Sequence, residues 1–307
     1  MKYKKSNICR LSTYFKWLSV LMCSVFFLLS TACGKPESPE EREPAVPSQE
    51  ITTAGADFNH EYTLDKTQKK MYSTIAKSMK EPSEEILIYE YKGDHMDFLL
   101  NDALVAMTCY TMDNPLDSQI LANCDIRMEK EDGKNKIYAY RRDNADNLEI
   151  AKLKLKDVEN VSRHFISTID SLDDEQKLRA IHDRLCQGKY DTEIDPASHT
   201  IYSALIDKNA VCDGYAYAFK YLCDLADIEC IVVIGYFNKS LDGELGHAWN
   251  LVWLGDTWKL VDISCDVYDS VSGSETPTYS HFLIDDLDID GRIPYKAYPV
   301  PMYKEFK

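Results

Sequence analysis

Apolar residues recur at helical spacing in several segments of the chain. Met71, Ile75 and Met79 lie four residues apart and follow Asp65, a residue type that caps helix starts, so the pattern predicts a helix over Leu64–Lys80. The same spacing predicts further helices over Asp94–Met112, from Leu155 through Ile169, from Asp173 to Gly188, over Ile201–Ile206 and from Cys212 to Ala226. Helical segments are thus spread over most of the chain.

Runs of β-branched and aromatic residues separate these helices. Glu85–Tyr91 and Ile231–Tyr236 predict strands, while Cys124–Lys130 and Lys136–Arg142 flank an Asp-Gly turn that is typical of a hairpin. A second hairpin is predicted where the runs HAWNLVW and WKLVDIS are joined by LGDT. Helices mixed with antiparallel hairpins indicate an α+β fold.

The second hairpin brings a histidine close to an aspartate. If its strands pair across a two-residue Gly255–Asp256 turn, Trp249 faces Asp262 and His247 faces Ser264. His247 and Asp262 then share one face as diagonal neighbours, roughly 7–8 Å apart, which two side chains can bridge. A slip of one residue would send Asp262 to the other face, so the predicted contact depends on this register.

The N-terminal segment has the pattern of a secretory signal. A basic start leads into the apolar run WLSVLMCSVFFLLS, which is followed by small residues and Cys33. This end resembles the lipobox of bacterial lipoproteins and implies a lipid on Cys33, although Ser30 stands where that motif prefers an aliphatic residue; an uncleaved membrane anchor is the alternative. We therefore expect a signal peptide over 1–32 and a protein held by lipid on the extracytoplasmic face of a cell membrane.

Composition divides the rest of the chain. Residues 33–55 are rich in Pro, Glu and Ser and predict a disordered tether. We expect a small α/β domain over 56–160 and a second domain, with the chemistry, over 161–307. The net charge of −16 makes nucleic acid an unlikely class of partner, because an acidic surface repels phosphates.

The cysteines indicate no metal centre. No Cys-x-x-Cys pair occurs in the sequence, so we expect neither a metal nor another cofactor. Six cysteines could form disulfides, in pairings that the sequence leaves open. They are Cys109, Cys124, Cys186, Cys223, Cys230 and Cys265.

Cys212 is the candidate nucleophile. It precedes a predicted helix, whose positive end favours a thiolate and whose first amide can stabilise an oxyanion. His247 is the candidate general base and Asp262 the carboxylate that orients it. Two other histidines, His199 and His281, are rival bases. His182 falls on an apolar helix face and is interpreted as a core residue, and His60 and His95 as surface or capping residues.

Several ordered motifs resemble the transglutaminase-like domain of bacterial extracytoplasmic proteins, which has a papain-like core. They are AIHDRL (180–185), YSAL (202–205), VCDGYAYAF (211–219), GHAWNLV (246–252) and WKLVDIS (258–264). The resemblance implies that Cys212 is the nucleophile, His247 the base and acid, and Asp262 the orienting group. It also implies a nucleophile helix packed on an antiparallel sheet. Cys265 departs from the family pattern, which often has Trp there, and this departure concerns the shape of the substrate pocket.

The expected function is acyl transfer from peptide or carboxamide bonds. Because water is always present outside a cell, we expect a peptidase or amidase rather than a cross-linking enzyme, acting on peptide, protein or cell-wall peptide. Trp249, Tyr215 and Trp258 are the candidate residues of the substrate groove. The alternative is a non-catalytic surface lipoprotein that binds peptide or cell-wall polymer in a groove around Trp249, Trp253 and Trp258.

Overall fold

The computed structural model describes residues 58–93, 96–143, 145–193, 195–240, 243–270, 278–300 and 302–303. The expected signal peptide, the tether, Cys33 and His95 lie outside the described residues. Within the described part, no helix combines the length and the apolar character needed to cross a bilayer.

The described residues of the first half form both helices and strands. They are α2 (Lys66–Ser78), β1 (Glu85–Tyr91), α3 (Met96–Asp113), α4 (Ser118–Leu121), β2 (Cys124–Glu131) and β3 (Lys134–Arg141). Helix α2 starts where predicted, because the Asp65 carboxylate accepts from Gln68 N at 2.8 Å and the Gln68 side chain accepts from Asp65 N at 3.1 Å. The hairpin turn also forms as predicted, with positive φ at Asp132 and Gly133.

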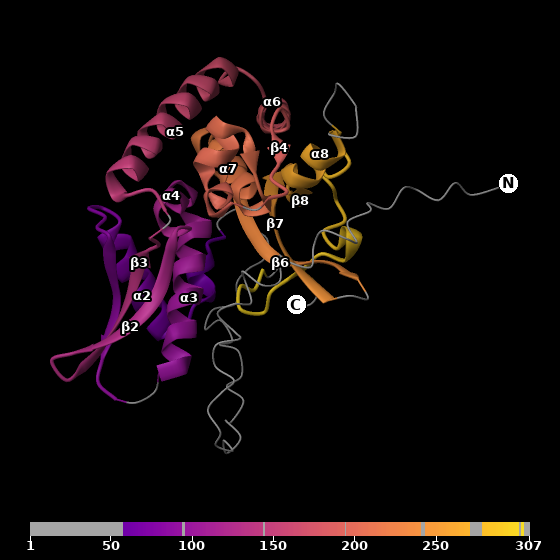
Figure 1. Ribbon diagram of the computed structural model, residues 1–307. Coiled ribbons are helices and arrows are strands. Elements are labelled where there is room, and N and C mark those ends of the chain that lie inside the picture. The colour runs from indigo at the N-terminus through magenta and orange to yellow at the C-terminus, as the bar shows by residue number, and fades with distance from the viewer. Residues whose placement is uncertain are drawn as a thin grey trace.

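These strands form an antiparallel sheet in the order β1-β3-β2, with α2 and α3 beside it (Figure 1). The long helix α5 (Leu148–Ile169) then leads from this half to the second (Figure 1). It begins a full two turns before the predicted start, because Asn147 caps it by accepting from Ile150 N at 3.0 Å. Residue 160, the expected domain boundary, lies inside this helix.

The second half places a helix on a four-stranded antiparallel sheet. Its elements are α6 (Asp174–Leu185), β4 (Lys189–Tyr190), β5 (Asn209–Ala210), α7 (Cys212–Leu225), β6 (Cys230–Ser240), β7 (Gly243–Leu254), β8 (Thr257–Val261), α8 (Ile263–Ser270) and β9 (Ile293–Pro294). The sheet order is β8-β7-β6-β9, and α7 packs against β6 and β7. The expected α+β class, with a nucleophile helix on an antiparallel sheet, is confirmed.

The second hairpin has the predicted register but a shorter second strand. Leu254 pairs with Thr257 across the Gly255–Asp256 turn, and pairing continues to Asn250 opposite Val261. The chain then turns into α8, so the expected pairs of Trp249 with Asp262 and of His247 with Ser264 are wrong. Ser264 is a helix residue, and Asp262 occupies the junction between strand and helix.

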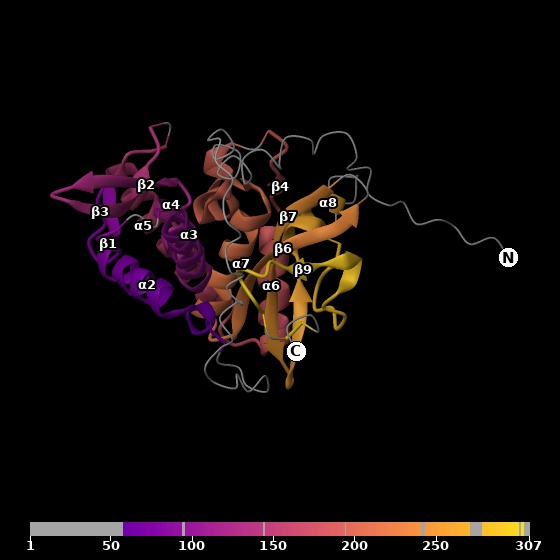
Figure 2. The same cartoon turned by 90° about the horizontal axis from the view of Figure 1, so that it is seen from below.

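The two halves share a hydrophobic core. One buried cluster joins Ala106 and Tyr110 of α3 to Tyr217 of α7 and Val232 of β6. His60 is 1% exposed and its Nε2 lies 2.8 Å from the Val232 carbonyl oxygen, so the expected surface role of His60 is wrong. Figure 2 shows α2 and α3 beside the half of the molecule that carries α7 and its sheet. The first half therefore packs against helix α7, since both contribute to one cluster.

Candidate active site

Cys212 is the first residue of α7 and is partly exposed. The preceding segment packs tightly against this helix start, where Val211 N donates to Ser198 O at 3.1 Å. Gly214 makes the approach possible, because a Cβ there would lie 2.6 Å from Ser198 O and 3.1 Å from Thr200 O. The thiol is thus held at the positive end of a fourteen-residue helix.

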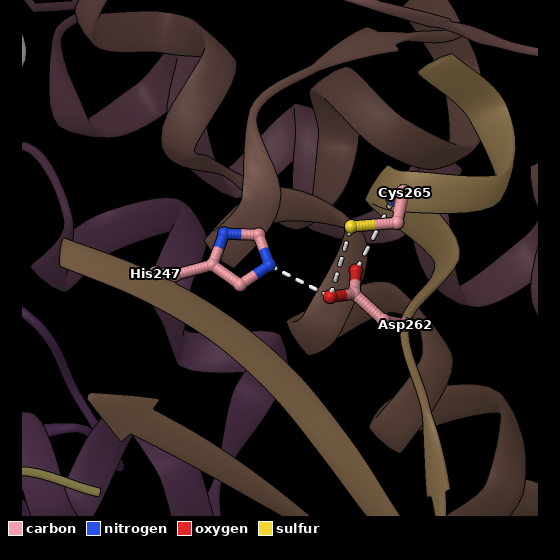
Figure 3. A group of neighbouring side chains, drawn as sticks. All are labelled: His247, Asp262 and Cys265. Atoms are coloured by element: carbon pink, nitrogen blue, oxygen red, sulfur yellow. Dashed lines mark hydrogen bonds and ion pairs between the residues drawn. The ribbon is translucent and has the colours of Figure 1, made fainter. Parts of the chain in front are cut away.

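The predicted contact between His247 and Asp262 forms. His247 projects from β7, and its Nε2 lies 2.7 Å from Asp262 Oδ2 (Figure 3). The same imidazole is hydrogen-bonded to the Cys212 thiol. The His247 side chain is 11% exposed and that of Asp262 only 1%, so the imidazole lies between a partly open thiol and a sealed carboxylate. We call Cys212, His247 and Asp262 the site group.

Asp262 has a partner for each of its oxygens. Oδ1 accepts from Ser264 Oγ at 2.8 Å and from Cys265 N at 3.2 Å. Oδ2 accepts from His247 and also from the Arg292 guanidinium, whose Nη2 lies 2.7 Å away. Donors that point at a carboxylate stabilise its ionised form and restrict its rotation. The carboxylate is therefore fixed in the orientation that faces His247.

The charges of the site group follow from these contacts. Burial by itself raises the pKa of Asp262, but the charges and hydrogen bonds of His247 and Arg292 outweigh it and hold that pKa well below its usual range. Burial likewise lowers the pKa of His247, yet the neighbouring Asp262 carboxylate reverses this effect and raises the pKa well above its usual range. Around neutral pH, His247 is an imidazolium and Asp262 a carboxylate.

Cys265 contacts the acid of the site group. Its Sγ lies 3.3 Å from Asp262 Oδ2 (Figure 3). The same sulfur lies 3.4 Å from Arg292 Nη2. Burial, followed by the Asp262 charge, raises the pKa of Cys265 to about 12. Cys265 is consequently a thiol that donates to Asp262 rather than a second thiolate.

The described residues include one group with metal-ligand chemistry. Ligand atoms of His247, Asp262 and Cys265 lie within 4.8 Å of one another. The Arg292 guanidinium donates to two of these three residues, so a positive charge already occupies the place where a cation would be bound. Charge repulsion therefore disfavours a divalent metal at this point.

A tyrosine beside Cys212 was not predicted from the sequence. Tyr190 of β4 is half-buried, and its side chain is hydrogen-bonded to the Cys212 side chain. Burial and the nearby Cys212 and Asp213 raise the pKa of this phenol, which keeps it protonated as a donor. The only sequence signal is an aromatic residue just after Gly188, where the preceding helix ends.

The rival bases His199 and His281 pair with carboxylates. His199 Nδ1 lies 2.8 Å from Asp213 Oδ2, and this charge, opposed by burial, raises the pKa of His199 to about 9. His281 Nε2 lies 3.0 Å from Asp290 Oδ2. His199 is thus half of an ion pair that flanks the helix start, and His281 belongs to the network behind Asp262.

The three candidate groove residues are all in the core. Trp249, Tyr215 and Trp258 are 0%, 0% and 6% exposed. Trp249 Nε1 donates to Tyr303 Oη at 2.8 Å, and Tyr215 Oη donates to the Lys189 carbonyl oxygen at 2.7 Å. Their expected place in a substrate groove is wrong, because both faces of the sheet are covered in this region and the rings stabilise the packing instead.

A second group of the same residue types lies deeper. His182 Nε2 lies 2.9 Å from Asp266 Oδ2 and 3.5 Å from Cys186 Sγ. All three residues are buried, and we call them the inner group. His182 is therefore a satisfied core histidine, as predicted. Disulfides are not formed among the cysteines of the described ranges.

Residues 163–263 match the family model of the Transglutaminase-like superfamily. The kyphoscoliosis peptidases of Homo sapiens and Mus musculus are each 32% identical to the chain over 123 residues, which is 36% of this chain and 19% of theirs. The chain thus spans about a fifth of the length of these relatives. A solved structure, the periplasmic domain of TgpA from Pseudomonas aeruginosa, is 16% identical with a TM-score of 0.31, over 45% of this chain and 58% of that one.

Proposed function

Because residues 163–263 belong to the transglutaminase-like superfamily, we propose that this chain is a cysteine acyl-transfer enzyme that cleaves peptide or carboxamide bonds with Cys212, His247 and Asp262. The observation that supports it best is one imidazole hydrogen-bonded to both a thiol at a helix start and a buried carboxylate. A nucleophile, its base and the group that orients the base are the minimum for acyl transfer through a thiol.

The reaction begins when the Cys212 thiolate attacks the carbonyl carbon of the substrate. The displaced electron pair moves to the carbonyl oxygen, where the Cys212 amide and the Tyr190 hydroxyl can donate hydrogen bonds. His247 then protonates the departing amine as the carbon–nitrogen bond breaks, which leaves a thioester on Sγ. Asp262 keeps the imidazole aimed throughout.

Water completes the reaction in the proposed hydrolase. His247, now neutral, removes a proton from a water molecule that attacks the thioester, and the products are a carboxylic acid and the free thiol. An amine in place of water would give a new amide, which is the cross-linking outcome. The named activity of the kyphoscoliosis peptidases supports hydrolysis. The chemistry itself requires no metal or organic cofactor.

The proposed location is the extracytoplasmic face of a membrane, with Cys33 as the lipidated residue. Peptides, proteins and cell-wall peptides are then the substrate classes within reach. The competing interpretation, a binding lipoprotein with an aromatic groove around Trp249, Trp253 and Trp258, has less support. Trp249 and Trp258 are buried, and the partly buried Trp253 packs edge-on against Trp258. We therefore retain the enzyme as the proposal.

The test is mass spectrometry of a peptide mixture incubated with the purified chain, with and without a free primary amine. Shortened peptides support the hydrolase, and amine adducts indicate a transferase. Cys212→Ala is the control, since it removes the attacking sulfur while the helix start remains. Identical product spectra from the wild type and Cys212→Ala would refute the proposal.

A further inference from the structure

Arg292 is a buried cation placed against the site group by a segment outside the matched region. It is 0% exposed and lies between the short helical turn Ile289–Gly291 and strand β9, after the end of the family match at residue 263. Strand β9 pairs with β6, where Pro294 faces Gly235. A side chain at Gly235 would overlap the backbone of Ile293, so the glycine permits β9 to lie this close.

The guanidinium joins two carboxylates. Nη2 lies 2.7 Å from Asp262 Oδ2, and Nη1 lies 3.2 Å from Asp290 Oδ2 and 3.1 Å from the Ile289 carbonyl oxygen. The Asp262 oxygen that Arg292 contacts also accepts from His247 at 2.7 Å. One oxygen is therefore shared between two cationic groups, the imidazolium and the guanidinium.

We propose that Arg292 is a positioning residue of the reaction, which holds Asp262 ionised and at the same time limits how tightly Asp262 retains the proton of His247. The inference rests on the proposed function, because it assigns Arg292 a role through His247. A buried carboxylate paired with an imidazolium alone would retain that proton strongly, since their attraction is large where water is excluded. A general acid that retains its proton too strongly is a poor donor to a departing amine.

Other charges around His247 are accounted for by their own contacts. Cys212 lies on α7, and Cys265 on α8 is a protonated thiol. Behind Asp262, His281 pairs with Asp290 and faces Asp266. The titratable and charged groups nearest to His247 are thus Cys212, Asp262, Cys265 and Arg292, with Tyr190, Asp213, His199, His281, Asp266 and Asp290 beyond them. Among the four nearest, Arg292 is the permanent cation.

The experiment measures alkylation of Cys212 by iodoacetamide against pH in the full chain, with the modified peptide quantified by mass spectrometry. A thiol coupled to an imidazole titrates in two steps, and the upper step reports loss of the His247 proton. In Arg292→Gln we expect the upper step to move up by about one pH unit or more. Arg292→Lys, which keeps the charge, should return it most of the way to the wild-type position.

Two controls separate this inference from a loss of folding. Arg141→Gln removes another arginine, whose side chain is 5% exposed and pairs with Glu84 in the first half, and should leave the upper step unchanged. Cys223 is 0% exposed, so its alkylation reports unfolding in any variant. If the Arg292→Gln variant fails to fold, the Asp290→Asn variant is measured in its place. Loss of that acid makes the surroundings of His247 more positive, so the upper step should move down by a few tenths of a pH unit.

The outcomes are distinct. An upper step that stays in place in Arg292→Gln, or that stays in place or rises in Asp290→Asn, overturns the role of Arg292. If His247→Ala gives the same profile as the wild type, the proposed function fails, because the thiol is then independent of the imidazole. An Arg292→Lys profile that matches Arg292→Gln also contradicts the inference, since the charge would have no effect.

Discussion

The site group and the inner group contain the same three residue types, yet only one of them has access to solvent. Cys212 begins helix α7, whereas Cys186 follows the last residue of α6. The helix dipole stabilises a negative sulfur at the first position and destabilises it at the second. His247 keeps 11% of its side chain exposed, and His182 keeps none.

The inner group has a structural role because its thiol and imidazole are sealed from solvent. The site group is suited to chemistry because its thiol is accessible. Burial, followed by the Asp266 charge, raises the pKa of Cys186, so this sulfur remains a thiol. His182 packs against the rings of Tyr279 and Phe282, each 4.8 Å away, and none of its side chain is exposed, which leaves no room for a substrate. The three residue types alone therefore do not define an acyl-transfer site. The position of the thiol on its helix and its access to solvent define the site.

Replacing each of the two cysteines in turn tests the difference between the groups most directly. Cys212→Ala should reduce peptide turnover by at least about 1,000-fold, because no other nucleophile replaces the thiolate. Cys186→Ala should leave turnover within about threefold and reduce the free energy of unfolding by about 1–2 kcal/mol through a small cavity. Turnover assays and urea unfolding measure both quantities. Equal losses of turnover in the two variants would contradict the assignment.

Removal of the inner histidine should mainly affect stability. His182→Ala leaves Asp266 buried without its imidazole and opens a cavity beside the rings of Tyr279 and Phe282, so the free energy of unfolding should fall by about 3 kcal/mol or more. Turnover per folded molecule should change little. Urea unfolding followed by fluorescence gives the first quantity, and active-site titration the second. A stable variant with reduced turnover would instead give the inner group a role in the chemistry.

Tyr190 is a further difference, because it gives the site group a donor beside its sulfur. Tyr190→Phe removes only the hydroxyl, and we expect about a 100-fold loss of kcat, the usual effect of one lost oxyanion donor. Substrate affinity should stay close to that of the wild type. Steady-state kinetics on a cleaved peptide give kcat and KM separately. A variant that changes KM alone would show that the hydroxyl binds the ground state only.

The smallest effect is expected at the ion pair that flanks Cys212. The Asp213 carboxylate raises the pKa of His199 from its ordinary value of 6.5 to about 9, so the pair contributes stability that is complete below pH 6.5 and is lost as the pH rises through about 9. His199→Gln should remove about 1–2 kcal/mol of unfolding free energy at pH 6 and almost none at pH 10. Denaturant unfolding at the two pH values measures this. A deficit of equal size at both would show that the charge is irrelevant.

Local sequence patterns predicted much of the fold. The Asp65 and Asp173 caps, the Asp132–Gly133 turn and the Gly255–Asp256 turn all depend on residues a few positions apart, and each forms as predicted. The end of β8 was not predictable in this way, because the run WKLVDIS contains no Gly or Pro that would end a strand before its last residue. Only the buried contacts of Asp262 and Ser264 show why the chain becomes helical there.

The sequence by itself indicated the resemblance to the transglutaminase-like family, the α+β class, the start of helix α7 and the contact of His247 with Asp262. Each of these depends on local residue patterns or on hairpin register. Tertiary structure decided the rest. It buried Trp249 and Trp258, and it brought Tyr190 to Cys212 and Arg292 to Asp262 from segments that share no local pattern with their partners. Arg292 is the one Lys or Arg between Lys259 and Lys296, within a run rich in Asp. The sequence therefore shows its charge but does not show which carboxylate it contacts. Which carboxylate a buried cation meets depends on how distant segments pack, and packing is a property of the whole fold.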